Sequence, residues 1–80
     1  MKAACEVETV VSTVINAKGE AQIIQGLMQW KNSTAQLDRR MRRALLERFR
    51  TCVKHAGLPQ SMTALCFSFI DQTQRDWRAH

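Results

Sequence analysis

The sequence predicts an all-α fold: a small bundle of about four helices, with one long basic helix over about residues 34–56 and a C-terminal helix over about residues 61–78. Two observations lead to this prediction. Apolar side chains recur every three or four residues in four successive stretches, which is the spacing of one face of an α-helix. Glycine, proline and small polar residues separate these stretches and mark the ends of the helices.

The length and charge of the chain limit its possible functions. Its 80 residues predict a single helical domain, residues 1–80, because neither a repeat nor a long linker divides them. The net charge of +5 favours an anionic partner. The sequence contains no apolar run of membrane-spanning length, and Glu6 and Glu8 interrupt the stretch that a secretory signal would need. We therefore expect a cytoplasmic protein without a membrane partner.

The first predicted helix covers residues 6–17. Its branched apolar residues fall on one helical face, whereas a strand would scatter them over both faces: Val7, Val10, Val11, Val14 and Ile15. Valine, isoleucine and threonine nevertheless prefer strands, so a β-hairpin within residues 6–25 remains the alternative and would make the fold α+β. We expect Gly19 to end the helix in the left-handed conformation.

The second predicted helix covers residues 20–31. Its apolar residues again share helical spacing: Ile23, Ile24, Leu27, Met28 and Trp30. A glycine inside a helix costs about 1 kcal/mol relative to alanine. We therefore expect Gly26 to lie close to another backbone.

The long basic helix has predicted boundaries at both ends. Ser33 or Thr34 is expected to cap its N-terminus, and Gly57 and Pro59 are expected to end it. Its apolar stripe contains Leu37, Met41, Leu45, Phe49, Cys52 and Ala56. The last predicted helix is capped by Ser61, and its stripe contains Met62, Leu65, Cys66, Phe69, Ile70, Thr73 and Trp77.

The surface of the long helix gives the main functional prediction. Seven basic residues and only two acidic ones lie on this helix, and the basic bias favours an anionic partner. Leu46 and Phe67 are expected beside this face as exposed apolar residues, a combination typical of protein-binding hot spots. The predicted partner-binding residues are Arg39, Arg40, Arg43, Leu46, Arg50, Lys54 and Phe67.

We accordingly expect a small non-catalytic regulatory or inhibitory protein that docks on a larger protein or nucleoprotein complex. Proteins of this size and charge are typical of phages and plasmids, and a homodimer would enlarge so small a core. The alternative is a dimeric helix-turn-helix transcriptional regulator whose turn lies at residues 57–60. It would read DNA through Gln60, Ser61 and Thr63, although these residues include no arginine or asparagine to read bases.

The sequence offers little for catalysis or metal binding. Cys52 and His55 could share a helix face, but no third residue is placed to orient the imidazole, so we do not expect an enzyme. A metal site would need Cys52, His55 and Cys66 to converge with Cys5 or His80, whereas structural zinc sites usually show two close ligand pairs. We expect no metal and no cofactor.

Overall fold

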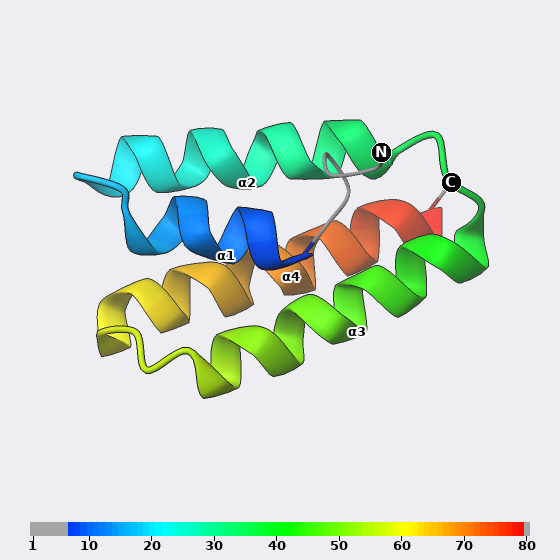
Figure 1. Cartoon of the computed structure of the whole chain (residues 1–80). Coiled ribbons are helices and arrows are strands. Elements are labelled where there is room, and N and C mark those ends of the chain that lie inside the picture. Colours follow the sequence, from blue (N-terminus) through cyan, green and yellow to red (C-terminus); the bar gives the residue numbers. More distant parts are fainter. Residues whose placement is uncertain (1–6, 80) are drawn as a thin grey trace.

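The computed structural model describes residues 7–79, which form four α-helices and no strand. The helices are α1 (Val7–Ile15), α2 (Glu20–Thr34), α3 (Arg39–His55) and α4 (Gln60–Ala79). Consecutive helices run antiparallel, and α1 lies between α2 and α3 (Figure 1). The predicted all-α bundle is confirmed. The hairpin alternative is wrong, because residues 7–15 and 20–25 are helical; Glu6 lies outside the described residues.

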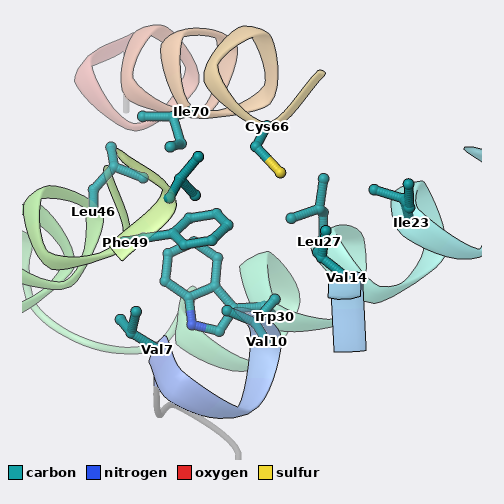
Figure 2. Close-up of a cluster of buried hydrophobic side chains, with 11 residues drawn as sticks. Val7, Val10, Val14, Ile23, Leu27, Trp30, Leu46, Phe49, Cys66 and Ile70 are labelled. Atoms are coloured by element: carbon teal, nitrogen blue, oxygen red, sulfur yellow. The ribbon is translucent and has the colours of Figure 1, made fainter. Parts of the chain in front are cut away.

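The core is centred on aromatic rings from different helices. Phe49 of α3 is fully buried and its ring centroid lies 5.0 Å from that of Trp30 of α2 (Figure 2). The ring of Trp77, on α4, also lies near Trp30, with a centroid distance of 6.4 Å. Each tilted aromatic pair of this kind adds about 0.5–1.5 kcal/mol beyond the burial of its surface. These rings therefore join α2, α3 and α4.

The boundary between α2 and α3 differs from the prediction. Ser33 and Thr34 do not cap the long helix, because α2 continues through Thr34, whose fully buried hydroxyl donates to the carbonyl of Lys31 at 2.9 Å. The cap of α3 is Asp38, whose carboxylate accepts from the backbone N–H of Met41 at 2.8 Å. Serine, threonine and aspartate are all good caps, so tertiary burial of the last turn of α2 decided between them.

The apolar face of α3 is rotated relative to the predicted stripe. The buried residues are Leu46, Phe49 and Val53, whereas Met41 is 50% exposed. The predicted stripe counted Leu37, which precedes the helix, and Met41, which lies in its first turn. Counting these two residues displaced the inferred centre of the buried face.

Two smaller boundary predictions also need correction, and one holds. Gly57 has the predicted left-handed conformation, with φ 70°. Gly19 does not: its φ of 175° is extended, and the Gln22 side chain accepts from the backbone N–H of Lys18 at 2.8 Å instead. Ser61 is not the cap of α4, because the helix begins at Gln60 and the carbonyl of Pro59 accepts the first bond from Thr63.

Gly26 marks the close approach of α1 and α2. A Cβ atom at this position would lie 2.7 Å from Cγ2 of Thr13, so the expected close packing is present, against a side chain instead of a backbone. Thr13 cannot rotate away freely, because its hydroxyl donates to the carbonyl of Thr9 at 3.1 Å and its side chain is β-branched.

A double-mutant cycle at this contact tests the fold. In a Thr13→Ala background, Gly26→Ala should raise the free energy of unfolding by about 1 kcal/mol, the usual helix gain. In the wild-type background the clash should remove that gain or make the change destabilising. Urea unfolding of the four proteins measures both effects; an equal gain in both backgrounds would show that α1 and α2 are not in contact here.

Candidate partner-binding surface

The basic residues of α3 fall into two groups. Arg48 pairs with Glu8 of α1 at 2.7 Å, and Arg50 pairs with Asp71 of α4 at 3.3 Å. Arg42 stacks over the Trp77 ring at 5.3 Å and donates to the carbonyl of Ala35 at 3.2 Å. The other group is exposed and makes no ion pair with any residue between 7 and 79: Arg39, Arg40, Arg43 and Lys54.

Most of the unpaired arginines surround a hollow between the start of α3 and the end of α4. The hollow has a volume of about 60 Å³. Four arginines line it, together with one acidic, one amide and two apolar side chains: Arg39, Arg42, Arg43, Leu46, Glu47, Gln74, Trp77 and Arg78. We call this site the arginine hollow.

The antiparallel register of α3 and α4 explains why these cations meet. Arg50 contacts both Asp71 and Gln74, which fixes the two helices side by side. Two turns towards the start of α3 lies Arg43, and two turns towards the end of α4 lies Arg78. The charge of Arg50 is thus neutralised where α3 contacts α4. Two turns away, the same pair of helices brings the cations Arg43 and Arg78 to one hollow.

The backbone of α3 adds positive potential at the same place. A helix N-terminus carries a partial positive charge, which favours acidic residues in the first turn. The first turn of α3 contains no acidic residue and includes Arg39, Arg40 and Arg42. Asp38, the capping residue, is acidic and accepts from the backbone N–H of Met41 in this first turn. The arginine hollow therefore combines side-chain charge with the helix dipole, and both favour a bound anion.

Arg42 is the residue of the hollow whose position is most constrained. Its contacts with Trp77 and Ala35 fix the guanidinium plane. Its Nε is nevertheless buried and has no hydrogen-bond partner in the part of the chain that the structure describes. An unpaired buried donor of a charged group is energetically unfavourable.

The predicted partner-binding residues are only partly brought together. Arg39, Arg40 and Arg43 lie at or beside the hollow, while Lys54 lies at the far end of α3. Leu46 is 4% exposed and belongs to the core, so its predicted exposed position is wrong. Phe67 is half-buried and packs against the core cluster. The rotation of the α3 face explains Leu46, because the same rotation that exposes Met41 turns Leu46 inwards.

Sequence reasoning missed the α4 side of the site, namely Gln74, Trp77 and Arg78. The available signal was the short connection after Gly57, which forces α3 and α4 to be neighbours. Because the end of α4 must then return to the start of α3, Arg78 could have been placed near Arg43 from the sequence.

The residues of the helix-turn-helix alternative lie at the opposite end of the α3–α4 pair from the arginine hollow (Figure 1). Gln60 and Ser61 are exposed, and the hydroxyl of Thr63 is 3.5 Å from the carbonyl of Leu58. Helices of a helix-turn-helix cross at about 90–120°. Here α4 returns along α3 as an antiparallel neighbour.

Among the described residues, Cys52, Cys66 and His55 do not belong to a group of potential metal ligands. Cys66 is fully buried, and burial raises the pKa of its thiol. His55 is exposed, and its Nδ1 lies 3.0 Å from the carbonyl of Thr51. Residues 7–79 contain no group of three potential metal ligands; Cys5 and His80 lie outside the described residues.

Comparison with known proteins gives no match to a protein-family model, a curated protein or a solved structure. None of the helices described between residues 7 and 79 combines the length and apolar character needed to cross a membrane.

The ion pair between α2 and α4 gives a pH prediction. Lys31 Nζ lies 2.6 Å from Asp76 Oδ2, and this hydrogen bond, followed by that from Gln72, lowers the pKa of Asp76 below its ordinary value of 3.8. The stabilisation is therefore complete above about pH 3.8 and is lost as the pH falls through the lower folded-state pKa. Asp76→Asn should destabilise the protein near pH 7, and this difference should disappear at acid pH. Chemical unfolding of both proteins across this pH range measures the difference in stability. A difference independent of pH would show that the Lys31–Asp76 ion pair does not stabilise the fold.

The charge pattern of α3 gives a stability prediction. Arg39→Glu should raise the free energy of unfolding by about 0.3–1 kcal/mol, because a negative charge in the first turn is favoured by the helix dipole. Lys54→Glu reverses a charge in the last turn of α3, where the helix dipole favours a cation, so this variant should lower the free energy of unfolding. Thermal unfolding should show opposite shifts for the two variants. Destabilisation by Arg39→Glu would show that Arg39 stabilises the fold.

Proposed function

We propose that this protein is a small, non-catalytic regulatory or inhibitory protein of the cytoplasm that docks on a larger protein or nucleoprotein. Its docking surface is the arginine hollow with the neighbouring Arg40. The observation that carries this proposal is the meeting of four arginines from two helices around one hollow, where Glu47 is the one acidic lining residue among residues 7–79.

Electrostatics supports an anionic partner. Like charges that converge on one hollow repel one another, and within the described part of the chain Glu47 alone among the lining residues compensates them. An anionic group from a partner relieves this repulsion and accepts hydrogen bonds from the guanidinium groups at the same time. The pairing of Arg48 and Arg50 with acidic residues elsewhere restricts this effect to one end of the bundle.

The composition of the hollow supports protein docking more than nonspecific attraction. Tryptophan and arginine are the residues most enriched among binding hot spots. Trp77 and Arg42 are already stacked and packed against the bundle, so little side-chain entropy remains to be lost when a partner binds. A rigid surface of this kind suits a stoichiometric inhibitor or adaptor.

Charge reversal at Arg43 tests the proposal against a control of equal net charge. Arg43→Glu should weaken binding of two anionic probes, a labelled random duplex DNA and polyglutamate, by about three- to tenfold, as expected for a charge-assisted contact that is partly exposed. Lys18→Glu changes the net charge equally but lies in the connection between α1 and α2, remote from the hollow. Fluorescence anisotropy at low and physiological salt measures both variants.

Equal losses in the two variants would contradict the proposal, because binding would then follow net charge alone. Duplex binding that persists at physiological salt and changes its sequence preference in Gln60→Ala and Ser61→Ala would instead support the DNA-reading alternative.

A further inference from the structure

The arginine hollow has features that a general basic surface does not need. Its lining combines cations with two apolar side chains, Leu46 and Trp77, which belong to or pack against the core. We infer that the hollow is a socket for the carboxylate of an aspartate or glutamate side chain on a partner protein, with an adjacent apolar side chain of that partner packed on Trp77. This inference rests on the proposed function and specifies its partner.

The donors of the hollow match a carboxylate. A guanidinium group donates two parallel hydrogen bonds to the two oxygens of a carboxylate, and such paired contacts are among the strongest in proteins. Arg42 is held in one orientation by Trp77 and Ala35, so its guanidinium group is already ordered before a partner binds. Arg39 and Arg43 lie one turn of α3 apart on the same side, as their shared lining of the hollow shows.

The size of the hollow also fits. Its volume of about 60 Å³ is several times the roughly 10–15 Å³ that one water molecule needs. A carboxylate group and its last methylene have room in such a space. The apolar floor then contacts the carbon atoms of the acidic side chain, while the arginines contact its oxygens.

The distribution of charge favours a single carboxylate over a nucleic-acid backbone. Each strand of DNA carries one phosphate charge per 3.4 Å of the duplex axis, and its binding proteins present an extended track of unpaired cations. Along the α3–α4 contact the unpaired cations stop after Arg43, because Glu47 follows and Arg50 is paired with Asp71. The surface is therefore matched to one local anion beside apolar surface.

Nuclear magnetic resonance of the isotope-labelled full-length chain tests the inference. The probe is a short peptide, blocked at both ends, that repeats alanine, leucine and glutamate; its control has glutamine in place of glutamate. The chain has only two tryptophans, so it gives two indole signals, which Trp77→Phe assigns. The glutamate peptide should shift the signals of Trp77 and of Arg42 Nε–H in a saturable way. Trp30, which is 3% exposed, should move less.

Two neutralising variants that each remove one positive charge provide a matched comparison. Arg39→Gln removes a lining cation and should weaken peptide binding at least about tenfold, a loss of about 1.4 kcal/mol. Lys18→Gln removes one cation from the connection between α1 and α2, which does not line the hollow, and should leave the affinity within about twofold. Thermal unfolding of both variants confirms that each is folded.

Four outcomes would overturn the inference. Equal shifts from the glutamine peptide would show that no carboxylate is recognised, and equal losses in the two variants would show that the hollow itself is not used. Duplex DNA that shifts Trp77 and Arg42 at physiological salt, without a response to the peptide, would make the occupant a phosphate. That third result would leave the proposed nucleoprotein docking intact. The absence of any response to the glutamate peptide or the duplex would also reject the socket, while the comparison of Arg43→Glu with Lys18→Glu decides the proposed function separately.

Discussion

Trp30 links three of the four helices and supports the candidate binding surface. Its ring contacts Phe49 of α3 and Trp77 of α4, and its own helix is held to α1 by the close approach at Gly26. Because a small domain buries a modest share of its surface, a few large aromatic contacts carry much of its stability. Trp77 is half-buried against this cluster and presents another part of its ring to the arginine hollow. Core packing and the candidate binding site thus share one side chain.

The arginine hollow places binding and stability in opposition. Arginines in the first turn of α3 are disfavoured by the helix dipole, and their mutual repulsion at the hollow adds to that cost. Three other cations follow the opposite rule: Lys31, Arg48 and Arg50 each have an acidic partner on another helix. The bundle therefore neutralises these three cations across helix contacts, whereas Arg39, Arg43 and Arg78 at the hollow make no ion pair with any residue between 7 and 79. Such a local departure is common at functional sites, where stability is not the property being optimised.

Features that depend on residues close in sequence were predicted more accurately than features that depend on contacts between helices. The helical nature of residues 7–15 followed from the spacing of its valines despite their strand preference. The start of α3 did not follow, because Thr34 and Asp38 are both competent caps and only the burial of Thr34 excludes it. The same ambiguity displaced the inferred face of α3, which turned Leu46 from a predicted surface residue into a core residue. In the candidate site, Arg39 and Arg43 were predicted on the basic face, whereas Trp77 and Arg78 were not.

The sequence by itself determined the number of helices, their approximate limits, the left-handed end at Gly57 and the basic character of α3. These properties depend on local periodicity, on the conformational freedom of glycine and on composition. Only the tertiary structure decided which arginines are paired and which are free, because an ion pair such as Arg50 with Asp71 joins residues that only the packing of α3 against α4 brings together. It also decided where the free arginines lie relative to Trp77, since the antiparallel register of α3 and α4 sets that position.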